Sequence, residues 1–205
     1  MDPEGRVFVV DDDAIVLRAV DRLLRSGGFT VQTFSSAKAF LDQLPYTGPA
    51  CVVLDLSMPE LSGLDVQEQL SVRGMPIPIV FFSGASNVSA TAEAMRKGAI
   101  DFLVKKIDDE ALVDAVSRAL AASVESQRRR RDEEETGGRL ARLTRRERQV
   151  CALVAKGFLN KQIAAELGMS EKTVKVHRGR LMRKLEVDSV AALVWLLSRV
   201  PTPPS

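Results

Sequence analysis

The first 120 residues alternate between short apolar runs and segments with helical periodicity, and this alternation narrows the fold more than any other feature. β-Branched and apolar residues fill five short runs, at 7–10, 30–34, 51–54, 79–82 and 102–104. Five segments of helical periodicity follow them, at 15–26, 37–44, 64–71, 88–97 and 109–124. Such alternation is typical of βα units with a parallel sheet covered on both faces. We therefore expect an α/β doubly wound, five-stranded parallel sheet with its functional residues at the carboxyl ends of the strands.

The charge of the chain is divided unevenly between its two halves. Residues 1–120 hold 11 Lys/Arg against 17 Asp/Glu, a net charge of −6, whereas residues 139–205 hold 14 against 5, a net charge of +9. This segregation predicts two domains with different partners, and a polyanion such as nucleic acid for the basic one.

The basic half has the pattern of a small helical domain. Thr144 and Glu147 have the spacing of a capping box and predict a helix start. Three more helices are expected at 160–167, 171–185 and 189–199, the first two of them separated by a tight turn at 168–170. Two helices joined by a short glycine turn, the second of them basic, form a helix-turn-helix pattern. We expect a small all-α four-helix helix-turn-helix domain after the α/β domain.

A charged segment connects the two halves. Four arginines at 128–131 precede four acidic residues at 132–135, so a solvated helix offsets part of its own charge. Gly137 and Gly138 are expected to end this helix. The predicted segments are the α/β domain over 1–122, a charged, partly helical linker over 123–139, the helix-turn-helix domain over 140–200 and a disordered tail over 201–205.

Several protein classes do not fit the composition. No run of about 18 apolar residues is present for a membrane span, and the N-terminus lacks the basic-then-apolar pattern of a signal peptide. Cys51 and Cys151 lie in apolar stretches, which is typical of reduced, buried thiols and not of a disulfide framework. These observations predict a cytoplasmic protein without a membrane partner.

Polar residues stand at the ends of four predicted strands. They are Asp11 and Asp12 after the first strand, Asp55 at the end of the third, Ser83 at the end of the fourth and Lys105 at the end of the fifth. Neighbouring parallel strands bring the three carboxylates together, and these are the oxygen ligands that Mg²⁺ prefers. A hydroxyl and an ammonium there can hold two oxygens of a phosphoryl group. Asp55 is then the expected nucleophile for phosphoryl transfer.

Residues 6–120 resemble the receiver domain of bacterial two-component response regulators. The matching segments are VVDDD, VVLDLSMPELSG, FFSGAS and DFLVKK. The resemblance implies that a sensor histidine kinase phosphorylates Asp55. It also implies that Asp12, Asp55 and the backbone carbonyl of Ser57 bind Mg²⁺, with Asp11 acting through water.

The resemblance extends to the residues that respond to phosphorylation, with one departure. Ser83 and Phe102 match the hydroxyl and aromatic positions that relocate, and Lys105 matches the lysine that binds the phosphoryl group. Receivers usually continue with a proline in a cis bond, where this chain has Lys106. A cis bond before a residue other than proline costs about 3–4 kcal/mol, so either the loop stores this strain or Lys105 arrives by another backbone path.

Residues 143–197 resemble the LuxR-type DNA-binding domain of the NarL/FixJ subfamily. The matching segments are LTRRERQV, GFLNKQIAAELGMSEKTVKVH and LMRKLEV. The resemblance implies that the helix at 171–185 enters the major groove and that Lys175 and Val176 face base edges. Lys161, Thr173 and Lys184 are the expected phosphate contacts. Gly179 stands where some relatives carry a basic base reader, for which Arg178 or Arg180 can compensate.

Together these features predict a transcription regulator that is phosphorylated on Asp55 and binds promoter DNA as a dimer, with RNA polymerase as a candidate partner. It would not be a turnover enzyme. A phosphatase of the haloacid-dehalogenase kind also uses a strand-end Asp, but it needs a second Asp where Ser57 stands. The remaining alternative is a phosphorylation-independent DNA binder whose receiver domain is only a scaffold.

Overall fold

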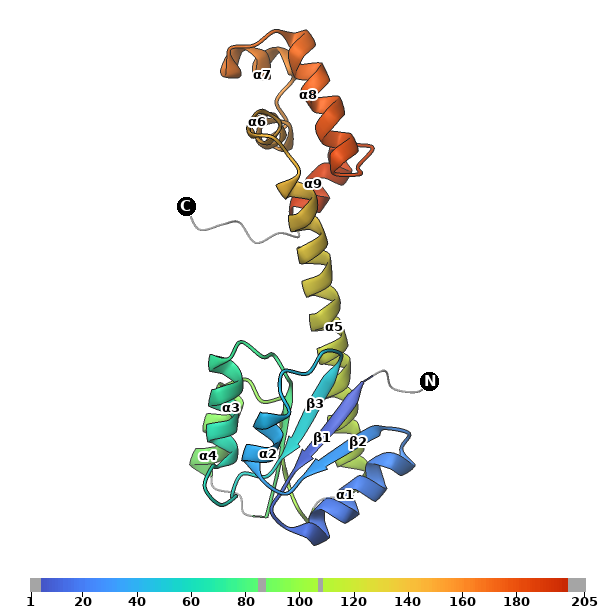
Figure 1. The fold of residues 1–205 in the computed structure, drawn as a ribbon, viewed down its shortest axis with the longest axis vertical. Coiled ribbons are helices and arrows are strands. Elements are labelled where there is room, and N and C mark those ends of the chain that lie inside the picture. The colour runs from blue at the N-terminus through green and yellow to red at the C-terminus, as the bar shows by residue number, and fades with distance from the viewer. Residues whose placement is uncertain (1–4, 85–87, 107–108, 199–205) are drawn as a thin grey trace. The chain divides into compact units, whose positions relative to one another are not determined.

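The computed structural model describes residues 5–84, 88–106 and 109–198 (Figure 1). They group into two compact units, Met1–Arg128 (the first unit) and Arg129–Ser205 (the second unit). The strands of the first unit are β1 (Arg6–Val10), β2 (Thr30–Phe34), β3 (Ala50–Leu54), β4 (Ile79–Ser83) and β5 (Asp101–Val104). Its helices are α1 (Ala14–Ser26), α2 (Ala37–Asp42), α3 (Gly63–Val72), α4 (Val88–Arg96) and α5 (Asp109–Ala141), the last of which continues into the second unit.

The five strands form one parallel sheet in the order β2-β1-β3-β4-β5, which confirms the expected doubly wound fold. Helices α1 and α5 cover one face of the sheet, and α2, α3 and α4 cover the other (Figure 1). Every residue of β3 and β4 is buried, as expected for parallel strands covered on both sides. In the register, Val10 lies opposite Leu54 and Leu54 lies opposite Phe81. The carboxyl ends of β1, β3 and β4 are therefore neighbours.

Helix α5 continues beyond the glycine pair that was expected to end it. It includes Gly137 and Gly138 and extends to Ala141, so the predicted break is wrong. A glycine in a helix is about 1 kcal/mol less favourable than alanine. Contacts beyond the pair offset this cost, because Leu140 packs against the core of the second unit and Arg139 forms an ion pair with Glu186. These contacts join residues that are far apart in the sequence, so no local sequence pattern indicates them.

The second unit contains the four expected helices, α6 (Arg145–Ala155), α7 (Asn160–Leu167), α8 (Glu171–Lys184) and α9 (Val190–Ser198). Thr144 and Glu147 form the predicted capping box at the start of α6. Gly168 ends α7 with a φ of 62°, the left-handed conformation that glycine adopts without a steric penalty. The predicted tail, residues 201–205, lies outside the described residues.

Both cysteines, Cys51 and Cys151, are free and buried, as their apolar surroundings predict. None of the helices in the described part of the chain has the length and apolar composition needed to cross a membrane.

Candidate phosphoacceptor site and nucleic-acid interface

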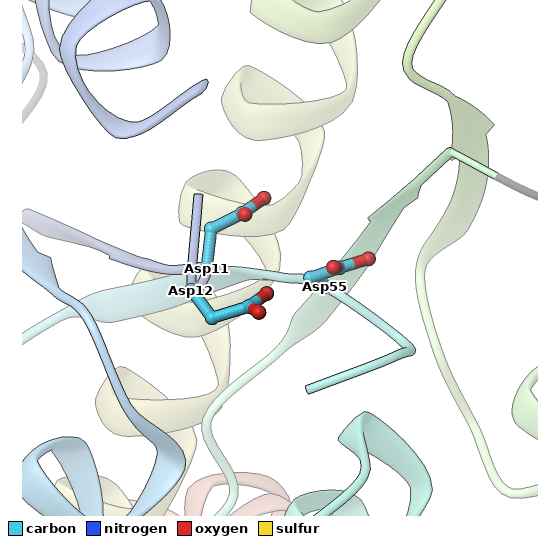
Figure 2. A group of neighbouring side chains, drawn as sticks. All are labelled: Asp11, Asp12 and Asp55. Atoms are coloured by element: carbon cyan, nitrogen blue, oxygen red, sulfur yellow. The ribbon is translucent and has the colours of Figure 1, made fainter. Parts of the chain in front are cut away.

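Three carboxylates meet at the carboxyl end of the sheet (Figure 2). Asp11 and Asp12 follow β1, and Asp55 follows β3, where its N–H donates to the carbonyl of Val10 at 2.9 Å. One oxygen from each of the three carboxylates lies within 4.8 Å of the others. Asp11 and Asp55 are buried and Asp12 is exposed, so the cluster opens to solvent on one side. The expected convergence of the acidic residues is present.

Lys105 lies within ion-pair distance of two of these carboxylates. Its Nζ is 2.6 Å from Asp11 Oδ2 and 3.1 Å from Asp55 Oδ2. Burial raises the pKa of Asp11, although the Lys105 ammonium partly opposes this effect. Burial lowers the pKa of Lys105, but the hydrogen bonds and charges of Asp11 and Asp55 raise it overall. Lys105 is therefore a charged ammonium that neutralises only part of the acidic cluster.

Two buried polar atoms beside Lys105 have no hydrogen-bond partner among the described residues, Asp55 Oδ1 and Ser83 Oγ. Ser83 ends β4, and the carbonyl of Ser83 accepts a hydrogen bond from the N–H of Lys105 at 2.9 Å. Buried polar groups are nearly always paired, so an unpaired carboxylate oxygen and an unpaired hydroxyl at one strand edge indicate a place for a polar ligand. The available partners are an acceptor, a hydroxyl and a cation, which suit a metal ion and a phosphoryl group.

The donor set fits Mg²⁺, which binds through oxygen ligands and keeps several water molecules. Asp11, Asp12 and Asp55 supply carboxylate oxygens, and the solvent-facing side of the cluster leaves room for water. Ser57 is exposed in the loop after β3, and the role of its carbonyl as a ligand stays a prediction. The third acidic residue of the run, Asp13, has a structural role, because its side chain caps α1 by accepting from the N–H of Ile15.

Lys105 reaches the pocket although Lys106 replaces the usual proline. Among the described residues, the only cis peptide bond is Leu44–Pro45, so the bond between Lys105 and Lys106 is trans. Of the two alternatives, a strained cis bond or another backbone path, the structure has the second.

Phe102 and Gly63 both lie against Phe81 of β4. Phe102 on β5 is partly buried and stacks on Phe81, with ring centroids 5.8 Å apart. Gly63 is the first residue of α3. A Cβ at this position would lie 2.4 Å from the carbonyl oxygen of Asp55 and 2.9 Å from the ring of Phe81. Gly63 is therefore needed for the close approach of α3 to the loop after β3.

Helix α8 has one buried and one exposed side, as predicted. Val174 and Leu181 are fully buried, and Leu185 just after the helix is buried with them. The exposed residues include four of the expected DNA contacts, which are Thr173, Lys175, Val176 and Arg180. Lys161 on α7 is also exposed. A Cβ at Gly179 would meet nothing within 4 Å, so this position is open on the helix surface.

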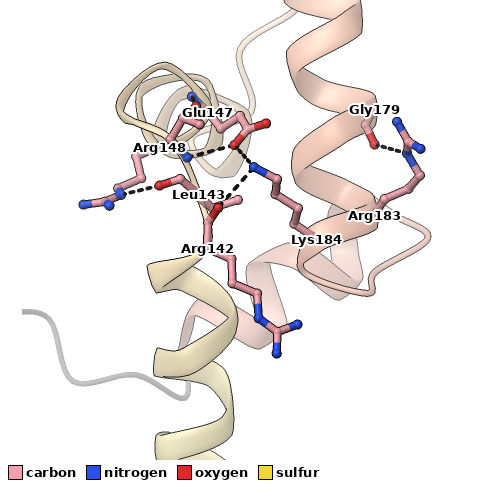
Figure 3. Close-up of polar contacts among 8 residues, drawn as sticks. Arg142, Leu143, Glu147, Arg148, Gly179, Arg183 and Lys184 are labelled. Carbon is pink, nitrogen blue, oxygen red and sulfur yellow. Dashed lines mark hydrogen bonds and ion pairs between the residues drawn. The ribbon is translucent and has the colours of Figure 1, made fainter.

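Two other expected DNA contacts have partners within the protein. Arg178 Nη1 donates to Asn160 Oδ1 of α7 at 3.0 Å. Lys184 Nζ donates to Glu147 Oε2 at 2.6 Å and to the carbonyl of Arg142 at 3.1 Å (Figure 3). The sequence suggested Glu147 only as a helix cap, so its ion pair with Lys184 was missed. DNA contact by Arg178 and Lys184 stays a prediction.

Comparisons with known proteins agree with both resemblances. The family of response regulator receiver domains matches residues 7–117, and the luxR family of bacterial regulatory proteins matches residues 141–197. Response regulator protein TmoT of Ectopseudomonas mendocina is 43% identical over 199 residues, which are 97% of this chain and 90% of that protein. Transcriptional regulatory protein FixJ of Azorhizobium caulinodans is 40% identical over 188 residues, covering 92% and 89% of the two chains.

Solved structures give the same result. The response regulator StyR is similar with a TM-score of 0.87 and 43% identity, covering 96% of this chain and 99% of that one. Full-length FixJ from B. japonicum is similar with a TM-score of 0.60 and 36% identity, covering 95% and 96%. The chain therefore belongs to the bacterial response regulators of the NarL/FixJ type, transcriptional regulators with a receiver domain and a LuxR-type DNA-binding domain.

Proposed function

We propose that Asp55 is the phosphoacceptor of this response regulator and that a sensor histidine kinase supplies the phosphoryl group. The observation that carries the proposal is the buried Asp55 Oδ1, which has no hydrogen-bond partner among the described residues and lies in a cluster with two more carboxylates. The ammonium of Lys105 is within 3.1 Å of the other oxygen of the same carboxylate. Asp55 is thus the acid in this pocket with a free oxygen next to a positive charge.

The chemistry follows from this arrangement. A carboxylate oxygen of Asp55 forms a bond to phosphorus while the P–N bond of the donor phosphohistidine breaks, and the bonding electrons stay on the histidine nitrogen. Lys105 moves its hydrogen bonds from the carboxylates to one phosphoryl oxygen, and the Ser83 hydroxyl donates to another. Mg²⁺, held by Asp11, Asp12, Asp55 and the carbonyl of Ser57, would supply further positive charge against the phosphoryl oxygens. Phe102 would change its position as Ser83 binds the phosphoryl group.

The output that we propose is sequence-specific DNA binding as a dimer. The exposed side of α8 would enter the major groove, with Lys175 and Val176 at base edges. Lys161 and Thr173 would contact phosphates, and Arg180 is exposed where it can compensate for Gly179. The proposed location is the cytoplasm, with RNA polymerase as a candidate partner. The phosphoryl group on Asp55 is a signal in this proposal, and no turnover reaction is assigned.

Phosphorylation can be tested directly with a small donor. The protein is incubated with acetyl phosphate and Mg²⁺, and its intact mass is measured beside that of Asp55→Asn. We expect a gain of one phosphate in the original protein, no gain in the variant, and no gain when the metal is chelated. Uptake at an equal rate by Asp55→Asn would show that another residue is the acceptor. Absence of uptake by the original protein, with DNA binding intact, would favour the alternative in which the receiver domain is a scaffold.

A further inference from the structure

The ammonium of Lys184 is held inside the second unit by a buried carboxylate. Lys184 lies in the last turn of α8, and its Nζ is 2.6 Å from Oε2 of Glu147, in the first turn of α6 (Figure 3). The side chain of Glu147 is only 3% exposed. The same oxygen accepts a hydrogen bond from the N–H of Thr144 at 2.8 Å. One buried carboxylate therefore joins the start of α6 to the end of α8.

A second hydrogen bond from Lys184 reaches the segment before α6. Its Nζ donates to the carbonyl of Arg142 at 3.1 Å, just after the end of α5 (Figure 3). An ammonium has three donors, so two of them are used within the protein. Moving Lys184 to a DNA phosphate would leave the carboxylate of Glu147 buried without a counter-ion, which is strongly unfavourable. This geometry does not suit a phosphate contact.

We infer that Lys184 and Glu147 are positioning residues, which fix α8 on α6 so that Lys175 and Val176 meet the base edges. The inference rests on the proposed DNA-binding role of α8. Lys175 and Val176 are on the same helix as Lys184 and are exposed, so a change in the tilt of α8 would displace them directly. Direct readout of bases depends on well-placed hydrogen bonds, whereas non-specific binding to phosphates depends mainly on charge. Loss of this ion pair should therefore weaken specific binding more than non-specific binding.

The test uses the full chain and two DNA probes. A duplex selected by the original protein from a random-sequence pool serves as the specific probe, and a scrambled duplex of equal length serves as the non-specific one. The variants are Glu147→Gln, Lys184→Gln and the double variant, with Lys161→Gln as the comparison for a true phosphate contact. Dissociation constants are measured at several salt concentrations, after the fluorescence of Trp195 has shown that the second unit is folded.

We expect each single variant to lower the ratio of specific to non-specific affinity about tenfold, a coupling typical of residues in contact. The salt dependence should stay unchanged in both, whereas Lys161→Gln should reduce the slope by about one. The double variant should recover part of the ratio, because its two amides can form a neutral hydrogen bond. If one single variant is too unstable to assay, the double variant is compared with the other single variant. The recovery of the affinity ratio in the double variant then decides the test.

Three results would overturn the inference. The first is a reduced salt slope in Lys184→Gln with normal binding by Glu147→Gln, which would make Lys184 a phosphate contact. The second is an equal loss on both probes, which is expected if the pair affects only stability. The third is a double variant that binds no better than Lys184→Gln. If the original protein selects no sequence from the pool, the proposed DNA-binding function fails instead.

Discussion

Replacing Lys184 with methionine should destabilise the second unit by about 2–3 kcal/mol at neutral pH. The Lys184 ammonium, together with the N–H of Thr144, lowers the pKa of Glu147 from its ordinary value of 4.5 to about 2. At about 1.4 kcal/mol for each pKa unit, this difference corresponds to about 3–4 kcal/mol of stability at neutral pH. Lys184 contributes more to the lowered pKa than Thr144 does. The stability lost in Lys184→Met should therefore be somewhat smaller than the stabilisation that corresponds to the whole pKa shift.

The predicted effect depends on pH in a defined direction. The folded protein holds Glu147 at a pKa below that of the unfolded chain, so its contribution is fully present above about pH 4.5 and is lost as the pH falls toward about 2. In Lys184→Met, the buried carboxylate lacks this stabilisation and takes up its proton more readily. The difference in stability between the two proteins should therefore be largest near pH 7 and should shrink below pH 4.5.

Urea unfolding followed by the fluorescence of Trp195 can measure this difference. Trp195 is the only tryptophan of the chain and lies on α9, so its signal reports the second unit even if the two units unfold separately. Arg183→Met is a matched control on the same helix, because Arg183 is exposed and its Nε bonds the Gly179 carbonyl at a long 3.4 Å. The control should lose at most about 0.5 kcal/mol. An equal loss in both variants, or a loss in Lys184→Met that is the same at pH 3 and pH 7, would refute the reasoning.

Three further predictions concern the two functional surfaces. Ser83→Ala should slow phosphoryl uptake from acetyl phosphate without lowering the stability of the first unit, because it removes a buried hydroxyl that has no partner among the described residues. Uptake rates and urea unfolding followed by circular dichroism would check this. Gly63→Ala should destabilise the first unit by about 1–3 kcal/mol and slow phosphoryl uptake, because the new Cβ would lie 2.4 Å from the carbonyl oxygen of Asp55. The same two measurements apply, and an unchanged uptake rate would contradict this prediction. Lys175→Ala should reduce discrimination at particular base pairs by about 1–3 kcal/mol, whereas Lys161→Ala should weaken binding to all sequences alike; competition with single-base variants of the selected duplex separates the two cases.

The acidic cluster could be predicted from the sequence because its geometry follows from strand order. Residues that directly follow neighbouring parallel strands must meet at one edge of the sheet, and Asp11 and Asp55 follow strands that pair directly. The alternation of apolar runs and helical segments was enough to locate those strand ends. The space limit at Gly63 could not be predicted in the same way, because it depends on how closely α3 approaches the loop after β3.

The length of α5 and the partner of Lys184 were not predictable from local patterns. The glycine pair disfavours a helix locally. Tertiary contacts outweigh this cost, because Leu140 packs against the core of the second unit and Arg139 donates a hydrogen bond to the carbonyl of Leu185, 46 residues away. Lys184 and Glu147 are 37 residues apart, and their sequence signals, a phosphate contact for Lys184 and a helix cap for Glu147, did not relate the two residues to each other. Only the packing of α6 against α8 brings them together.

Asp55 and Glu147, two of the buried acidic residues in the described part of the chain, differ in whether their carboxylate oxygens have partners. Oε2 of Glu147 accepts from both Thr144 and Lys184, so its charge is matched within the fold. Asp55 shares Lys105 with Asp11, and its Oδ1 has no hydrogen-bond partner among the described residues. A buried carboxylate whose partners all lie within the protein needs no ligand. A buried carboxylate with an unpaired oxygen is stabilised when a cation or another polar partner binds, and this binding stabilises the folded protein. This difference, and not burial or charge alone, is the physical reason to assign Asp55 to ligand chemistry and Glu147 to the placement of a helix.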